Sequence, residues 1–240
     1  MGANPRRIYV WIAIGIGVAV AIATAIAFTS NPIPIPDDRT SKIKVFPPDS
    51  KPYGKTYLEY SIAMWRMIQS IPRSENPVFD TTGSKCQVSQ NDPNVWYASG
   101  TAGGSAERKC TISASKAPLI PVVAGECSFL EDKSANTDEK RRACITAGTK
   151  NAIMNLFVDG QDIPNLKDYW AEGAIRDVPF IKDNMWGAEE GITDEWAAGY
   201  YVLLEPLPPG EHVIHWEAAV TSIEGTQLFA LDVTYHLTVE

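Results

Sequence analysis

The sequence is short of basic residues: 21 lysines and arginines stand against 29 acidic residues, and the formal net charge is −8. Residues 1–30 contain Arg6 and Arg7 and no acidic residue, so the remainder of the chain is more acidic still. Proteins that bind nucleic acid need clustered lysine and arginine to displace counterions from the phosphate backbone. We therefore expect no nucleic-acid partner.

Catalytic and cofactor motifs are also missing. The chain has no HExxH, GxSxG, P-loop or EF-hand pattern. Only three histidines occur, which limits general-base and metal chemistry. The glycine-rich stretch 100–105 lacks the lysine and the strand-to-helix setting of a phosphate loop, and we expect it to join two strands as a hairpin. We expect no cofactor, and a binding protein is favoured over an enzyme.

A long uncharged run stands out at the N-terminus, in a chain whose 45% hydrophobic content is otherwise typical of a globular protein. Residues 8–28 would span about 30 Å as a helix, which is the thickness of the bilayer core. Arg6 and Arg7 precede this run, so the positive-inside rule predicts cytoplasmic residues 1–7, a transmembrane anchor at 8–28 and an extracytoplasmic remainder in the cell envelope. The alternative is a cleaved signal peptide, because Ala25 and Ala27 form a small-x-small site.

Prolines dominate the residues that follow. Residues 29–52 alternate proline with other residues at 31–36 and add Pro47, Pro48 and Pro52, which favours an extended tether. Residues 53–240 then form one extracytoplasmic domain of ordinary size.

The cysteines number four, and none forms a CxxC pair, so a zinc site has little support. An even number in an exported domain predicts two disulfides. Three pairings are possible; we favour Cys86–Cys110 and Cys127–Cys144, which close short separate loops.

Hydrophobic periodicity predicts a mainly β domain with two short helices. Thr56 and Glu59 form a capping box before an apolar stripe at helical spacing that ends at Pro72, and 137–147 is the second expected helix. Residues 229–239 and 212–221 alternate with period two, and a register pairing Trp216 with Val233 puts apolar opposite apolar. With 198–205 these segments predict a three-stranded meander. We expect 164–198 to be irregular, and the fold to be an antiparallel β-sandwich, Ig-like or jelly-roll-like.

The candidate ligand or metal site lies on the polar face of this predicted C-terminal hairpin. His215, Glu217, Asp232 and His236 share that face, and Glu217 lies opposite Asp232. Two histidines with a carboxylate can ligate a divalent metal. The alternative is an ordinary solvated sheet face without metal.

Tryptophans and acidic residues suggest weaker alternatives. Trp96, Trp170, Trp186 and Trp196 could stack on sugars, although core packing is the favoured interpretation. The acidic residues of 177–195 match no calcium loop, so we expect them to lie in solvated loops.

Several motifs resemble a family of exported prokaryotic proteins whose activity is not established. They are PPDSKPYGKTY at 47–57, SIP at 70–72, NP at 76–77, CTIS at 110–113, ECS at 126–128, LPPGEH at 207–212 and DVTYHL at 232–237. The resemblance covers nearly the whole exported domain. It implies export and a four-cysteine β-rich fold, and it supplies no catalytic residues.

Two classes of function follow from these patterns. The favoured hypothesis is a membrane-anchored, extracytoplasmic binding or structural protein that contacts an envelope protein or a surface polymer. The alternatives are a metal-binding protein or enzyme that uses the hairpin face, and a carbohydrate-binding module.

Overall fold

The computed structural model describes residues 42–221 and 226–240. Its helices are the 3-10 turns η1 (Pro52–Gly54), η2 (Arg73–Glu75), η3 (Pro77–Phe79) and η4 (Leu166–Tyr169), and the α-helices α1 (Tyr57–Gln69) and α2 (Asp138–Thr149). Its strands are β1 (Val95–Tyr97), β2 (Gly104–Ile112), β3 (Ala117–Ser128), β4 (Ile153–Val158), β5 (Gln161–Asp162), β6 (Trp170–Phe180), β7 (Gly191–Leu203), β8 (Gly210–Thr221) and β9 (Gln227–Val239).

The strands form two sheets. One sheet has the order β1-β3-β7-β6 and the other has the order β2-β9-β8-β4-β5. Most pairs are antiparallel, but β1 runs parallel to β3 and β2 runs parallel to β9. The β-rich, two-sheet, two-helix architecture predicted from the sequence is confirmed at this level and is consistent with a β-sandwich.

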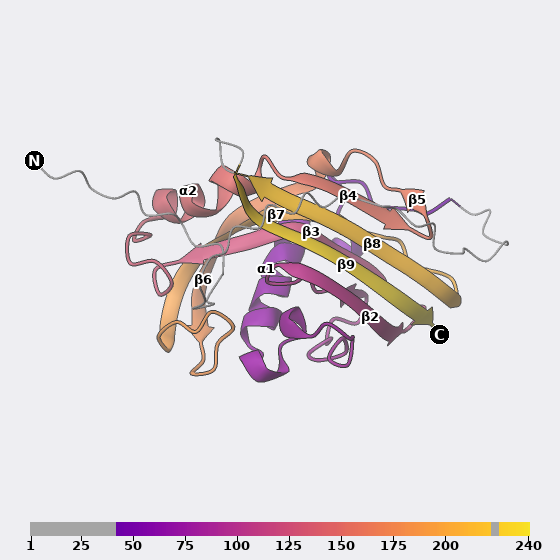
Figure 1. The fold of residues 1–240 in the computed structure, drawn as a ribbon, viewed down its shortest axis with the longest axis horizontal. Coiled ribbons are helices and arrows are strands. Elements are labelled where there is room, and N and C mark those ends of the chain that lie inside the picture. Colours follow the sequence, from indigo (N-terminus) through magenta and orange to yellow (C-terminus); the bar gives the residue numbers. More distant parts are fainter. Residues whose placement is uncertain (1–41, 222–225) are drawn as a thin grey trace, which may run out of the picture.

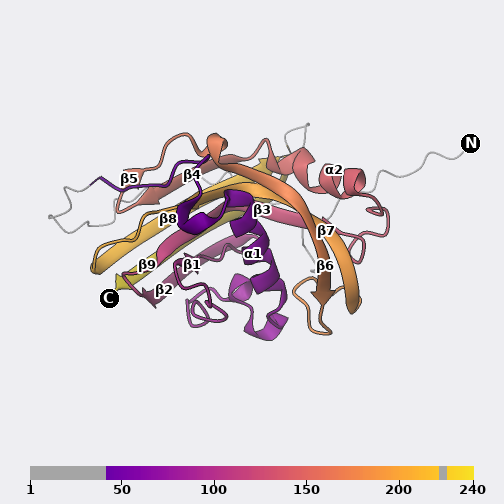
Figure 2. The ribbon, with the colours of Figure 1, turned by 180° about the vertical axis from the view of Figure 1, so that it is seen from behind.

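The two sheets and α1 make three layers. The largest apolar cluster lies between the sheets, around Trp96, Trp216 and Tyr235. A second cluster lies on the other face of the four-stranded sheet, where Tyr60 and Trp65 of α1 cover it. Figures 1 and 2 show β6 and β7 curving past the end of the five-stranded sheet, with α1 on one side of them and α2 on the other.

Helix α1 begins as the sequence predicts. The Thr56 hydroxyl accepts from the Glu59 N–H, and the Glu59 carboxylate accepts from the Thr56 N–H at 2.7 Å. This capping box satisfies two free donors of the first turn. The apolar stripe behind it places Met64, Trp65 and Ile68 against the sheet.

A bulge in β3 decides which of its side chains face α1. The register with β7 shifts between Pro121 and Val123, where proline has no N–H to continue the ladder. Val122 and Val123 therefore both enter the core between the sheets. Glycine is required opposite the bulge, because a Cβ on Gly199 would lie 2.6 Å from the Val123 carbonyl oxygen. Beyond the bulge the alternation is reversed, and Glu126 lies on the α1 side.

The structure contains two disulfides, with the favoured sequential pairing. Cys86 is bonded to Cys110 of β2, and Cys127 of β3 is bonded to Cys144 of α2. The second disulfide anchors α2 beside the end of β3.

The β8–β9 hairpin has the predicted register, with Trp216 opposite Val233. Three other predictions are wrong. The loop 100–105 is not a hairpin, because β1 and β2 belong to different sheets. The three-stranded meander is also wrong, because β7 and β8 belong to different sheets. Strand β7 pairs with β3 and β6, not with β8. The stretch 164–198 is not irregular, since β6 and the first part of β7 lie in it and bury alternate side chains.

None of the helices in 42–221 and 226–240 is long and apolar enough to cross a membrane. The predicted cytoplasmic residues 1–7, the anchor at 8–28 and most of the tether at 29–52 lie outside the described residues.

Candidate functional site

Three of the four residues predicted on the hairpin face come together on the outer surface of the five-stranded sheet. His215 Nε2 lies 3.1 Å from Asp232 Oδ1 and 3.8 Å from Glu217 Oε1. Potential ligand atoms of the three residues all lie within 4.8 Å of one another. We call these residues the outer hairpin cluster. Their arrangement could hold one divalent cation with a single imidazole and two carboxylates.

His236 does not join this cluster. It pairs across the ladder with Val213, and its Nε2 lies 2.9 Å from Glu107 Oε1 of β2. The structure therefore brings one of the two predicted histidines together with the two carboxylates, and places the other beside Glu107. The sheet explains the separation, because Thr234 rather than His236 lies opposite His215.

The four tryptophans considered for sugar stacking are scattered. Trp96 is buried between the sheets, Trp170 packs on Tyr200, and Trp196 packs near the Cys127–Cys144 disulfide. Trp186 stacks on Trp65 of α1, with ring centroids 6.1 Å apart. The four tryptophans therefore do not form a common surface for stacking on a sugar. Trp96, Trp170 and Trp196 pack against the apolar clusters, as the favoured interpretation predicts.

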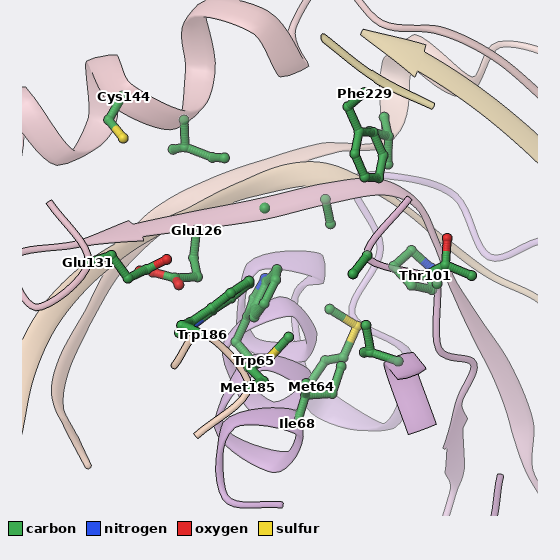
Figure 3. A pocket seen from close by; sticks show the side chains of 18 residues that line it. Met64, Trp65, Ile68, Thr101, Glu126, Glu131, Cys144, Met185, Trp186 and Phe229 are labelled. Atoms are coloured by element: carbon green, nitrogen blue, oxygen red, sulfur yellow. The ribbon is translucent and has the colours of Figure 1, made fainter. Parts of the chain in front are cut away.

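The fourth, Trp186, lines a cavity of about 130 Å³ at the side of β3. Its apolar wall comes from α1, the loop before β7, the loop after β1 and the start of β9, through Met64, Ile68, Met185, Ala102 and Phe229. Figure 3 shows Phe229 and Cys144 on one side of the β3 ribbon and Trp65, Trp186 and Glu126 on the other, so the cavity follows the edge of this strand.

Carboxyl groups close one end of this cavity. Glu126 of β3 is 8% exposed, and the carboxyl groups of Glu126 and Glu131 point toward one another (Figure 3). Glu195 of β7 is fully buried on the same side, and its Oε2 accepts from Gln69 Nε2 of α1 at 2.7 Å. We call Glu126, Glu131 and Glu195 the inner carboxylate cluster. The expectation that the acidic residues of 177–195 lie in solvated loops is wrong for Glu195.

The inner carboxylate cluster is short of donors. Neither carboxyl oxygen of Glu126 meets an N–H or O–H group, and Glu195 Oε1 and Gln69 Oε1 are also buried without a partner. No ion pair within 42–221 and 226–240 reaches these acids; the nearby Arg66 guanidinium donates instead to the Arg176 carbonyl. Two carboxyl groups can share a hydrogen bond only if one of them carries a proton.

The pKa values follow from this setting. Burial, reinforced by the Glu131 and Glu195 carboxylates, raises the pKa of Glu126 well above its ordinary value. Burial also raises the pKa of Glu195 to about 7, against the opposing effect of the Gln69 hydrogen bond. Desolvation and like charge both disfavour ionisation. Within the cluster the proton is therefore held preferentially by Glu126, which donates it to a neighbouring carboxylate.

The cavity can thus recognise a ligand of mixed character. Its walls suit an apolar body, and its acidic end suits a cation or a hydrogen-bond donor that replaces the proton of Glu126. The indole N–H of Trp186 is also buried without an acceptor, so it can donate to a ligand oxygen. Within the described residues, the outer hairpin cluster is the one group whose three potential ligand atoms all lie within 4.8 Å of one another.

Sequence reasoning missed this cavity. Glu126 lies in ECS at 126–128, at the end of the long apolar strand β3. The sequence feature that could have revealed the cavity is an acidic residue at a position of β3 whose side chain points inward. Simple alternation along the strand does not give this orientation for Glu126, because the bulge reverses the alternation.

Comparisons of the chain with protein-family models, with curated proteins and with solved structures give no match.

Proposed function

We propose that this protein is a non-enzymatic, extracytoplasmic binding protein whose β3 cavity takes a ligand with an apolar body and a cationic head. The observation that carries the proposal is Glu126: a buried carboxyl group at the end of an apolar cavity, whose oxygens meet no donor apart from neighbouring carboxyl groups. Buried polar groups in folded proteins nearly always have partners. A cationic group from outside would supply a charged donor in place of the proton that these carboxyl groups share.

Binding of a cation at Glu126 requires the proton to leave. The ligand ammonium or guanidinium group then donates to the ionised carboxylate, and the charge that burial disfavours is neutralised. Affinity should therefore increase as the pH rises toward the pKa of Glu126, and each binding event should release a proton.

Benzylamine is a suitable probe, because a cavity of roughly 150 Å³ holds benzene. We expect the full chain, in mild detergent near neutral pH, to bind benzylamine at least about tenfold more tightly than neutral benzyl alcohol by titration calorimetry. The binding heat should vary with the ionisation enthalpy of the buffer, which reports the released proton.

Glu126→Gln keeps the shape of the side chain and removes the charge. It should abolish the preference for benzylamine over benzyl alcohol, whereas Glu217→Gln on the opposite sheet should leave it unchanged. Equal affinity of the wild-type chain for the two compounds, or no binding of either, would overturn the proposal.

The proposed location is the outer surface of a membrane, with 8–28 as anchor and 29–52 as tether. The two disulfides support an oxidising compartment. Alkaline extraction of membranes tests the anchor: the full-length chain should stay in the membrane pellet. A shortened chain in the soluble fraction, beginning after Ala27, would establish cleavage instead.

A second candidate function is divalent-metal binding at the outer hairpin cluster, favoured by the 4.8 Å spacing of its ligand atoms. Imidazole with two carboxylates suits Zn²⁺ or Mn²⁺. We expect His215→Ala to remove Zn²⁺ binding measured by calorimetry, and the matched His236→Ala to retain it. Equal Zn²⁺ affinity of the two variants would exclude this site.

A further inference from the structure

The cavity beside β3 borders a strand edge that has no neighbour. On one side β3 pairs with β7 from Leu119 to Ser128. On the other side β1 pairs with β3 only from Ala117 to Leu119. Within the described chain, the edge beyond Leu119 is therefore unpaired, and the cavity lies along it.

The ladder shows which backbone groups point to this edge. Leu204 N–H donates to the Pro118 carbonyl at 2.9 Å, so even-numbered residues of β7 direct their backbone groups toward β3. Beyond the bulge these residues lie opposite odd-numbered residues of β3. Backbone groups alternate in direction along a strand, so Ala124 and Glu126 direct their N–H and C=O groups away from β7, toward the cavity. Ser128 continues the series, and its carbonyl accepts from an N–H outside the sheet.

This edge is covered by side chains but not paired. Glu126 is buried, Ala124 is half-buried, and neither forms a backbone hydrogen bond to another segment of the described chain. Buried backbone groups need partners, and an unpaired edge is a template for another strand. Phe229 and Trp186 lie on opposite sides of this edge, and we call the space between them the groove.

We infer that the occupant of this groove is an extended segment of another protein, which adds to the edge of β3 and places a lysine or arginine at Glu126. The inference rests on the proposed function and names its ligand class. An added strand supplies backbone donors and acceptors for Ala124 and Glu126. Its side chains alternate, so an apolar one can fill the cavity beside Trp65 and Trp186. The inner carboxylate cluster favours a basic residue, because its ammonium or guanidinium group can replace the proton of Glu126 and pair with the ionised carboxylate.

Blocked peptides of alternating valine and threonine, with one central lysine and a fluorescent dye, test the inference by anisotropy on the full chain. Strand addition predicts binding, and a loss of at least about tenfold when alternate backbone amides along one edge of the peptide are methylated. Methylation along the other edge, which faces away from β3, should have little effect. Replacing the lysine by norleucine should cause a comparable loss. In Glu126→Gln, the lysine and norleucine peptides should bind equally.

Two readouts on the protein separate strand addition from simple cavity binding. Hydrogen exchange of the Ala124 and Glu126 amides should slow by at least about tenfold in the peptide complex, and this needs no variant. Ala124→Pro removes one edge N–H and is compatible with an edge strand. It should weaken binding of the peptide, because that backbone donor is lost.

The outcomes distinguish the two proposals. Benzylamine binding without peptide binding, or equal binding of methylated and unmethylated peptides, overturns strand addition and leaves the proposed cavity function standing. Failure of both benzylamine and peptides to bind overturns both. Unchanged exchange of the Ala124 and Glu126 amides in a peptide complex also overturns strand addition.

Discussion

The two acidic clusters of this protein contain similar side chains in opposite surroundings. In the outer hairpin cluster, Asp232 is exposed, and His215 bridges it to Glu217. In the inner carboxylate cluster, Glu126 and Glu195 are buried with few donors, and no ion pair among the described residues reaches them. Water and salt screen the outer charges, whereas burial disfavours the inner ones. The protonated form is therefore favoured in the inner cluster and not in the outer one.

The pH dependence of stability is the largest effect expected from this difference. The folded protein holds the pKa of Glu126 and Glu195 above the unfolded value, so folding binds protons. Their favourable contribution is complete below about pH 4.5 and is lost as the pH rises through about 7 for Glu195. Glu195 alone should lower the free energy of unfolding by roughly 3 kcal/mol over this range.

Chemical denaturation of the full chain, followed by tryptophan fluorescence from pH 4.5 to pH 8, measures this slope. Carboxylates with lowered pKa, such as Asp80 and Asp92, lose their contribution only at more acid pH and do not mask it. A stability that stays level or increases toward pH 8 would contradict the assignment of a stored proton.

Replacing one carboxylate of each cluster by its amide compares the contributions of the two clusters to stability directly. Glu195→Gln preserves an acceptor for Gln69 and removes the ionisation, so it should stabilise the protein by about 2 kcal/mol at pH 8 and have little effect at pH 4.5. Asp232→Asn in the outer hairpin cluster should change stability by less than about 0.5 kcal/mol at either pH. Thermal unfolding of both variants in one buffer series compares them directly. If the two variants respond alike, burial does not distinguish the clusters.

The outer hairpin cluster was predictable from the sequence, and the inner carboxylate cluster was not. Strict alternation in 212–221 and 229–239 determines faces and register, because a slip by one residue would expose Trp216 and Val233. The position of Glu126 depends on the bulge at Pro121, and its burial depends on α1 and the loop around Trp186. No local pattern encodes contacts between segments so distant in sequence.

Strand partners were the weakest part of the sequence-based prediction, for a related reason. The sequence predicts a hairpin around the loop 100–105 and a meander that joins 198–205 to the C-terminal strands, because short loops commonly connect neighbouring strands. The chain instead passes from one sheet to the other after β1 and again after β7. In a two-sheet fold a short loop can cross between layers as well as turn within one, and local sequence does not distinguish these connections.

The smallest expected effect concerns repulsion within the outer hairpin cluster. Glu217 and Asp232 lie directly opposite each other on β8 and β9, where like charges destabilise a sheet. His215 Nε2 is 3.1 Å from Asp232 Oδ1 but 3.8 Å from Glu217 Oε1, so the Glu217 carboxylate has no hydrogen bond from this imidazole. Glu217→Gln should therefore stabilise the protein by about 0.3 kcal/mol in low salt.

Salt provides the control for this last prediction. The gain from Glu217→Gln should disappear in about 1 M sodium chloride, where screening acts over a few ångströms, while the gain from Glu195→Gln should persist because that site is buried. Melting curves of both variants at low and high salt provide the measurement. A salt-independent gain at Glu217 would mean that the outer carboxylates are shielded from solvent like the inner ones, and the distinction between the two clusters would fail.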